Sequence, residues 1–192
     1  MNTVFVDVDT QLDFLYPAGA LYVRKAERIV PAVAKLNNFA AGHGIPVVST
    51  TDAHTENDPE FAAWPHHCVS GTMGQHKPES TLLAGRVVIP NRECPFSIEG
   101  ARQIILEKQT VDMFQALNTS RLLALLEADR YVVYGVVTEV CVLHAVRGLI
   151  QAGRQVTVVT DAIEALKAEN SARALAEMTA GGATLASVSQ IA

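Results

Sequence analysis

Side chains able to do covalent and metal chemistry follow the ends of several short apolar runs. The places are Asp9 after Thr3–Val8, Asp52 and His54 after Pro46–Thr51, Lys108 after Ile104–Glu107, and Cys141 after Tyr131–Val136. If these runs are parallel strands, their carboxyl ends meet at one edge of the sheet, where open α/β folds bind ligands. A thiol, a carboxylate, an ammonium and a set of metal ligands would then share that edge, although strand ends are polar in most proteins.

Cys141 is the candidate nucleophile. The pattern places it about one turn into a helix, with Thr138 positioned to cap that helix. The helix dipole and the free amides of a helix start favour a thiolate. The alternative is a buried structural cysteine, because Cys141 is followed by valine and leucine. Cys68 and Cys94 lie in predicted loops without a helix start, and we interpret them as bystanders.

Lys108 and Asp9 are the candidate partners of the thiol. Lys108 is either a solvated surface residue or, if it faces the shared edge, a cation that stabilises a neighbouring thiolate and carboxylate. Asp9 could then accept the thiol proton as a general base.

A carboxylate and two imidazoles form a candidate metal site. Asp52 and His54 are two residues apart, on one side of an extended segment, and His67 lies further along the following loop. Three such ligands leave coordination positions open, which suits catalytic Zn²⁺, Fe²⁺ or Mn²⁺. His66 and His76 compete with His67 for the third position.

Alternation of strand and helix patterns predicts how these residues are positioned. The β-branched runs are Thr3–Val8, Pro46–Thr51, Arg86–Ile89, Tyr131–Val136, Gln155–Thr160 and Ala183–Val188, with Ile104–Glu107 as a further short run. The helical patterns are Ala26–Ala41, Thr119–Ala128, Cys141–Ala152 and Ala168–Ala180. We expect a Rossmann-like, three-layer α/β/α sandwich around a mostly parallel six-stranded sheet. The polar segment from Asp52 to Gly85 has no clear period, and a loop of that length is usually functional.

Composition narrows the class of protein. The chain has 192 residues, which predicts a single domain over residues 1–192 at roughly 100–200 residues per domain. A net charge of −5 without a basic run argues against a nucleic-acid or anionic-membrane partner. The N-terminal stretch soon reaches Asp7 and Asp9 and lacks the layout of a signal peptide, and three cysteines are too few for a disulfide scaffold. We therefore expect a cytoplasmic protein.

Three motifs resemble one enzyme family. Asp9–Phe14 (DTQLDF) resembles the D-x-Q-x-D-F motif that opens the isochorismatase-like cysteine hydrolase superfamily, and Gly135–Val142 (GVVTEVCV) resembles its nucleophile segment. Lys108, between them, matches the catalytic lysine of that superfamily. Asp52–His54 (DAH) together with Trp64–Val69 (WPHHCV) resembles the metal-binding segment of the nicotinamidase branch.

This resemblance implies an isochorismatase-like fold and a set of roles. The implied catalytic triad is Asp9, Lys108 and Cys141, and the implied metal ligands are Asp52, His54 and His67. The implied cofactor is one divalent metal ion per chain, Zn²⁺ first, with Fe²⁺ or Mn²⁺ as alternatives. The family also has a cis peptide, here Val136–Val137, which turns the Val137 amide toward the site to form an oxyanion hole with the Cys141 amide.

The implied activity is that of a nicotinamidase, which hydrolyses nicotinamide to nicotinate and ammonia through a thioester and serves NAD salvage. The expected partner is a small aromatic amide, with Phe14 and Trp64 available to sandwich its ring; a homo-oligomer is left open. The chain departs from the branch at Ala53, which replaces tryptophan, and at Glu139-Val140, which replaces Asp-Tyr beside the pocket. Pro95–Gln103 also differs. The alternatives are therefore a hydrolase of another small amide or carbamoyl compound, or a non-catalytic binding protein on the same fold.

Overall fold

Seven parallel strands form the sheet at the centre of the structure, a computed structural model that describes residues 2–192. The strands are β1 (Thr3–Val8), β2 (Val47–Asp52), β3 (Arg86–Ile89), β4 (Gln103–Lys108), β5 (Arg130–Val136), β6 (Gln155–Glu164) and β7 (Thr184–Ala186). Their order is β3-β4-β2-β1-β5-β6-β7, and each neighbouring pair is parallel. The predicted α/β class with a mostly parallel sheet is confirmed.

The predicted number of six strands is wrong, because the short Ile104–Glu107 run belongs to a full strand inside the sheet. This strand, β4, pairs with β2 on one side and with β3 on the other. Its polar ends, Gln103 and Lys108, conceal its length in the sequence, yet both side chains are buried. The register sets Lys108 opposite Asp52 of β2. The additional strand therefore brings a buried cation to the carboxyl edge.

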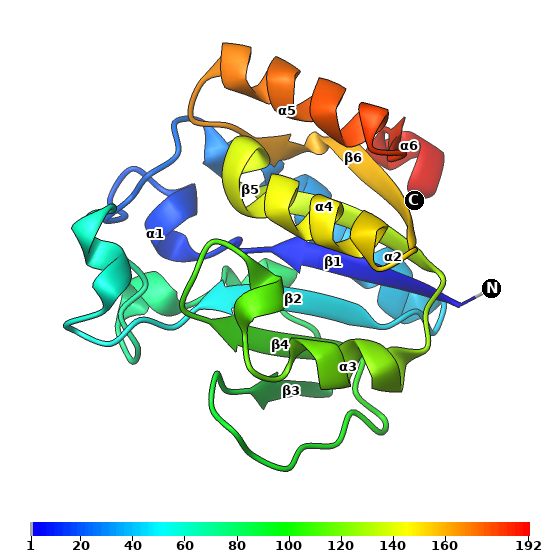
Figure 1. Ribbon diagram of the computed structural model, residues 1–192, viewed down its shortest axis with the longest axis horizontal. Coiled ribbons are helices and arrows are strands. Elements are labelled where there is room, and N and C mark those ends of the chain that lie inside the picture. The colour runs from blue at the N-terminus through cyan, green and yellow to red at the C-terminus, as the bar shows by residue number, and fades with distance from the viewer. Residues whose placement is uncertain (1) are drawn as a thin grey trace.

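Helices cover both faces of the sheet. They are α1 (Leu12–Leu15), α2 (Val30–Gly42), α3 (Thr119–Leu126), α4 (Leu143–Gln151), α5 (Ala168–Ala180) and α6 (Val188–Ile191). Figure 1 shows α3 and α4 in front of the sheet and α2 behind it, which gives the three predicted layers. The predicted helix Ala26–Ala41 is divided into a 3-10 turn, Ala26–Ile29, and α2, which has Pro31 in its first turn. None of the helices within residues 2–192 is long and apolar enough to cross a membrane.

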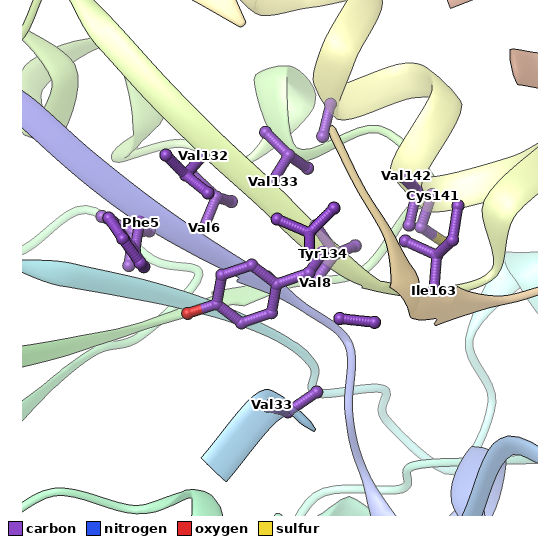
Figure 2. Close-up of a cluster of buried hydrophobic side chains, with 14 of the residues drawn as sticks. Phe5, Val6, Val8, Val33, Val132, Val133, Tyr134, Cys141, Val142 and Ile163 are labelled. Carbon is purple, nitrogen blue, oxygen red and sulfur yellow. The ribbon is translucent and has the colours of Figure 1, made fainter. Parts of the chain in front are cut away.

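The core lies on both faces of the central strands. Every residue of β2 is buried, as are Val4–Val8 of β1, which is the pattern expected of a parallel sheet between two helical layers. Figure 2 shows Val142 and Cys141 beside Ile163, in a cluster that also contains valines of β1 and β5. The candidate nucleophile therefore stands against the hydrophobic core rather than on an open surface.

The long polar segment after β2 lies beside α1 at the carboxyl edge of the sheet (cyan to green in Figure 1). Its regular structure is limited to the 3-10 turns Pro59–Ala62, Met73–Gln75 and Glu79–Thr81 and to a bridge between His54 and Val69. The segment thus brings its histidines to the edge where the other candidate residues end.

Gly135 lets β1 and β5 approach closely at this edge. Its φ is +121°, and a Cβ added there would lie 2.1 Å from the carbonyl oxygen of Val8. We expect Gly135→Ala to lower the free energy of unfolding by about 3 kcal/mol or more, because both the backbone conformation and the space exclude a side chain. Urea unfolding followed by circular dichroism measures this loss.

Gly42→Ala is the matched control. Gly42 ends α2 without a left-handed φ, and an added Cβ would meet nothing within 4 Å. Its unfolding free energy should stay within about 1 kcal/mol of the wild-type value. Equal losses in the two variants would contradict the close approach at Gly135.

Candidate active site

The structure brings Asp9, Lys108 and Cys141 together at the carboxyl edge of the sheet. Asp9 follows β1 with a left-handed φ of +48°, Lys108 ends β4, and Cys141 lies in the π-helical turn Thr138–Val142 after β5. Lys108 Nζ is 2.9 Å from Asp9 Oδ2, and both Asp9 and Lys108 are near enough to the Cys141 thiol to shift its pKa. All three are buried, with exposed fractions of 1%, 1% and 8%. The candidate nucleophile, the candidate base and a cation thus lie together away from bulk water.

The Lys108 ammonium is shared between two carboxylates. Besides Asp9, it contacts Asp52 Oδ1 at 2.5 Å and donates to the carbonyl oxygen of Thr110 at 3.0 Å. Burial by itself would lower the pKa of Lys108, but Asp52 and Asp9 raise that pKa well above its ordinary value. The lysine therefore stays charged.

The two carboxyls have pKa values shifted in opposite directions. Burial raises the pKa of Asp9, and the attraction of Lys108 only partly offsets it. Burial also acts on Asp52, but Lys108 and the nearby imidazoles of His54 and His67 outweigh it and leave the pKa of Asp52 far below its usual range. Asp52 is therefore held ionised, whereas Asp9 has the higher proton affinity that a general base needs.

The predicted thiolate at Cys141 is not what this environment favours. Burial raises the pKa of the Cys141 thiol well above its ordinary value; Lys108 opposes this shift, and the nearby Asp9 adds to it. The nucleophile therefore rests as a thiol and needs a base in order to react.

The predicted capping role of Thr138 is wrong. Thr138 is the first residue of the π-helical turn, no side chain caps this turn, and the Thr138 hydroxyl donates to the carbonyl oxygen of Glu164 at 2.9 Å. The sequence could not reveal this partner, because it lies on β6.

The predicted metal ligands converge as well. Asp52, His54 and His67 are buried, and each offers one ligand atom such that these atoms all lie within 4.8 Å of one another. Asp52 Oδ2 lies 3.8 Å from His54 Nε2 and 3.6 Å from His67 Nε2. The buried His54 Nε2 has no hydrogen-bond partner among the described residues. A buried nitrogen without a hydrogen-bond partner is suited to bind a metal ion, and one carboxylate with two imidazoles suits a divalent ion.

An oxygen atom lies beside the other nitrogen of each imidazole. His54 Nδ1 lies 3.1 Å from Asp58 Oδ2, and His67 Nδ1 is 2.6 Å from the carbonyl oxygen of Pro65. Such partners orient a histidine ligand and leave Nε2 for the metal. Asp58, which was not predicted from the sequence, is therefore part of the support of this site.

The competing histidines lie elsewhere. His66 is exposed and stacks on Phe61 at a centroid distance of 4.2 Å, and His76 is also exposed. Neither belongs to the ligand group formed by residues 2–192.

Two further residues of the first motif hold the site by hydrogen bonds to main chain. Gln11 Oε1 accepts from the Asp52 amide at 2.7 Å, and Gln11 Nε2 donates to the carbonyl oxygens of Asp52 and Gln75. Asp13 Oδ2 accepts from the amide of Cys68, the residue after His67, at 2.7 Å. The motif thus fixes the position of both the ligand strand and the ligand loop.

A small, largely apolar pocket opens beside Cys141. The predicted substrate residues Phe14, Trp64 and Val140 all line it, as does Val137. The Val136–Val137 peptide bond is cis, as the resemblance implied; the oxyanion hole formed by the Val137 and Cys141 amides stays a prediction.

Further residues on the pocket wall were not predicted from the sequence; they are Leu21, Val23, Glu60, Val111 and Leu166. Glu60 stands out among them, because its buried Oε2 has no hydrogen-bond partner in residues 2–192. Burial is the largest cause that raises the pKa of Glu60, and the charge of Asp52 raises this pKa further.

Comparisons with known proteins identify the family. The isochorismatase domain model matches residues 3–190, so the chain belongs to the isochorismatase domain family. The nicotinamidase of Escherichia coli K12 is 29% identical over 207 residues, covering 93% of this chain and 91% of that protein. The predicted membership is therefore confirmed.

Solved structures agree with this assignment. The pyrazinamidase of Pyrococcus horikoshii, solved in complex with zinc, is 26% identical with a TM-score of 0.80 and covers 97% of this chain and 99% of its own. The N-carbamoylsarcosine amidase of Thermoplasma acidophilum, 24% identical, has a TM-score of 0.80, with 98% of this chain and 97% of its own covered. The second likeness shows the fold alone.

The adjacent histidines allow a sharp test of the metal site. We expect His67→Ala to weaken binding of a divalent ion at least about 100-fold, because one of three converging ligands is lost. His66→Ala should bind the ion like the wild type, since His66 stacks on Phe61. Zn²⁺ titration calorimetry of the metal-stripped proteins measures both affinities. Loss of Zn²⁺ binding in His66→Ala together with wild-type binding in His67→Ala would refute this ligand set.

Proposed function

We propose that the chain is an amide hydrolase with a cysteine nucleophile, specifically a nicotinamidase that converts nicotinamide and water to nicotinate and ammonia. The observation that carries the proposal is the buried Asp9–Lys108 pair near Cys141, beside an apolar pocket and a group of metal ligands. Similarity to the E. coli nicotinamidase supports the choice of substrate. We assign the activity to one domain, residues 1–192, acting in cytoplasmic NAD salvage.

The first half-reaction forms a thioester. Asp9 takes the proton of the Cys141 thiol as the sulfur attacks the amide carbon, and Lys108 holds the charge of the carboxylate and sulfur that it faces. The amides of Val137 and Cys141 stabilise the tetrahedral oxyanion. Asp9 then returns the proton to the leaving nitrogen, the C–N bond breaks, and ammonia departs.

The second half-reaction hydrolyses the thioester. Asp9 now takes a proton from water, whose oxygen attacks the thioester carbon. The C–S bond breaks, the acid is released and Cys141 regains its proton. The opposite pKa shifts of Asp9 and Asp52 support Asp9 as the base in both halves.

The metal ligands would hold one end of the substrate. Asp52, His54 and His67 would bind a divalent ion, Zn²⁺ first and Fe²⁺ or Mn²⁺ as alternatives. When bound, the ion supplies a Lewis acid that can take the ring nitrogen of the substrate or a water bound to that nitrogen. The unpartnered His54 Nε2 and the zinc of the Pyrococcus pyrazinamidase support this assignment.

Aromatic and aliphatic side chains would hold the ring itself. Phe14 and Trp64 are available to sandwich a flat ring. Val140 fills less of the pocket than an aromatic side chain would. Another small amide or a carbamoyl compound is therefore the second candidate substrate.

Variants of the reacting groups test the chemistry. We expect Cys141→Ala to lower the rate of ammonia release from nicotinamide at least about 1000-fold, because no thioester can form. Asp9→Asn should lower the same rate at least about 100-fold, because one carboxyl moves protons in both half-reactions. A coupled ammonia assay with nicotinamide, pyrazinamide and carbamoyl compounds measures both.

Cys94→Ala is the control, because Cys94 is only partly buried and does not line the pocket. It should keep wild-type turnover. Residual turnover above a few per cent in Cys141→Ala would remove covalent catalysis, and release of ammonia from carbamoyl compounds alone would favour the second substrate class.

Removal of the metal tests its role. Treatment with a chelator should raise the KM for nicotinamide without trapping an acyl-enzyme, because Asp9 already serves as the base for water. Mass spectrometry of the treated enzyme mixed with substrate checks for an adduct on Cys141. A persistent acyl adduct in the metal-free enzyme alone would show instead that metal-bound hydroxide performs the hydrolysis.

A further inference from the structure

Strand β1 carries a second buried acid, Asp7, two residues before the candidate base. Asp9 pairs with Lys108, whereas Asp7 pairs with Lys77 of the long polar segment at 3.1 Å between Oδ2 and Nζ. The side chains of this second pair are 0% and 2% exposed. Lys77 Nζ has no hydrogen-bond partner within residues 2–192, so the charge of Asp7 compensates its burial. Neither residue takes part in the proposed chemistry, and neither lines the pocket beside Cys141.

One oxygen of Asp7 is fixed by groups on the α2 side of the sheet. Asp7 stands opposite Ser49 of β2 and Tyr134 of β5 in the register. Its Oδ2 accepts from the Ser49 hydroxyl at 3.1 Å and from the side-chain amide of Asn37, on α2, at 3.3 Å. The Tyr134 hydroxyl in turn donates to Asn37 Oδ1. All these side chains are buried, and together with Lys77 they hold the carboxylate in one orientation.

The other oxygen of Asp7 reaches the turn that contains the candidate base. The buried Thr10 hydroxyl donates to Asp7 Oδ1 at 2.6 Å, a bond that spans Asp9. Asp9 has a left-handed φ of +48°, which a residue other than glycine keeps only where its surroundings fix it. Thr50 binds the Asp9 carboxylate itself, and the Gln11 amide donates to the Asp9 carbonyl oxygen. The Asp7–Thr10 bond is therefore the link between this turn and the second ion pair.

The exact place of Asp9 matters for the reaction. Its carboxylate has to lie beside both Lys108 and the Cys141 thiol, and a misplacement of about 1 Å can cost about 100-fold in rate. A turn with an unfavourable φ relaxes when one of its supports is removed. The link to Asp7 thus acts on the chemical step and not on the pocket walls.

We propose that Asp7 is a positioning residue for the reaction, which holds the left-handed turn at Asp9 through the Thr10 hydroxyl. Lys77 keeps the Asp7 carboxylate charged and in place. This inference deepens the proposed function and rests on it, because Asp9 is the base of that mechanism. It also gives the long polar segment a second role, since Lys77 supports the base from the same segment that supplies His67.

The Thr10 hydroxyl is the link that can be removed without changing charge or shape. Thr10→Val should lower kcat for nicotinamide about tenfold and leave KM within twofold, because the base moves while the pocket walls, which do not include Thr10, stay in place. Thr10→Ser keeps the hydroxyl and should bring kcat back to within threefold of the wild type. A coupled ammonia assay measures both constants.

Variants of the ion pair test its contribution. Lys77→Met and Asp7→Asn each leave one buried charge without its partner, and each should lower kcat about tenfold or more, as measured in the same assay. The double variant, Asp7→Asn with Lys77→Met, has no unpaired charge, and its asparagine oxygen can still accept from Thr10. It should recover most of the lost kcat. A double variant no better than the worse single variant would show that the pair does not act as a unit.

Two controls separate positioning from a general loss of structure. Thr157→Val makes the same substitution on β6, where the hydroxyl meets that of Thr184 at 2.9 Å, and should leave kcat and KM unchanged. Metal-stripped Thr10→Val should bind Zn²⁺ with wild-type affinity in titration calorimetry, because none of the three candidate metal ligands contacts the Thr10 hydroxyl in the part of the chain that the structure describes.

The outcomes distinguish this inference from the proposed function. A kcat within twofold of wild type in Thr10→Val, an effect confined to KM, or an equal loss in Thr10→Ser would overturn the positioning role and leave amide hydrolysis standing. A wild-type enzyme that releases ammonia from no amide, or an Asp9→Asn variant with wild-type turnover, would instead refute the proposed function itself.

Discussion

A buried ammonium between two carboxylates organises the site. Lys108 lies 2.9 Å from Asp9 and 2.5 Å from Asp52, and all three side chains are out of contact with water. A buried charge is tolerated only where partners compensate it, and removing one member of such a group costs about 3–5 kcal/mol. The three residues come from β4, β2 and the end of β1, so this compensation is possible only when those strands pair in the observed order and register. The demands of charge burial and of catalysis thus select the same arrangement.

Asp52 joins the charged group to the metal ligands. One of its oxygens contacts Lys108, and the other faces the Nε2 atoms of both His54 and His67. Gln11 holds the Asp52 main chain on both its amide and its carbonyl. Because a single carboxylate serves both sides, the geometry of one residue sets how the charged group lies relative to the candidate metal ligands. Such rigidity is what places a small substrate within reach of a nucleophile.

Much of this site could be predicted from the sequence, because near-continuous apolar runs identify parallel strands and the residues after them must share one edge. The features that could not be predicted depend on partners far apart in the sequence or on how deeply a side chain is buried. The apolar run within β4 is short, and Lys108 at its end resembles a surface residue until its two carboxylate partners are known. Whether Cys141 rests as a thiol or a thiolate depends on burial, which opposes the helix start. The partner of Thr138 is the last residue of β6 and the partners of Glu139 lie on the connection after it, so local patterns do not reveal them.

Most apolar residues of the pocket wall come from other parts of the fold than the charged group, and this division has a consequence for specificity. Phe14 follows β1 on α1, Trp64 lies in the long loop, and Leu166 precedes α5, whereas Lys108 and Asp52 end adjacent strands. A change of side chain in a loop alters the shape around the substrate without disturbing a buried ion network, since no hydrogen bond of that network reaches Leu166 or Trp64 among the described residues. Glu139 is the exception, because it lies on the nucleophile turn and binds the wall directly. Its carboxylate, which accepts from the Leu166 amide, therefore links the shape of the pocket to the turn that carries Cys141.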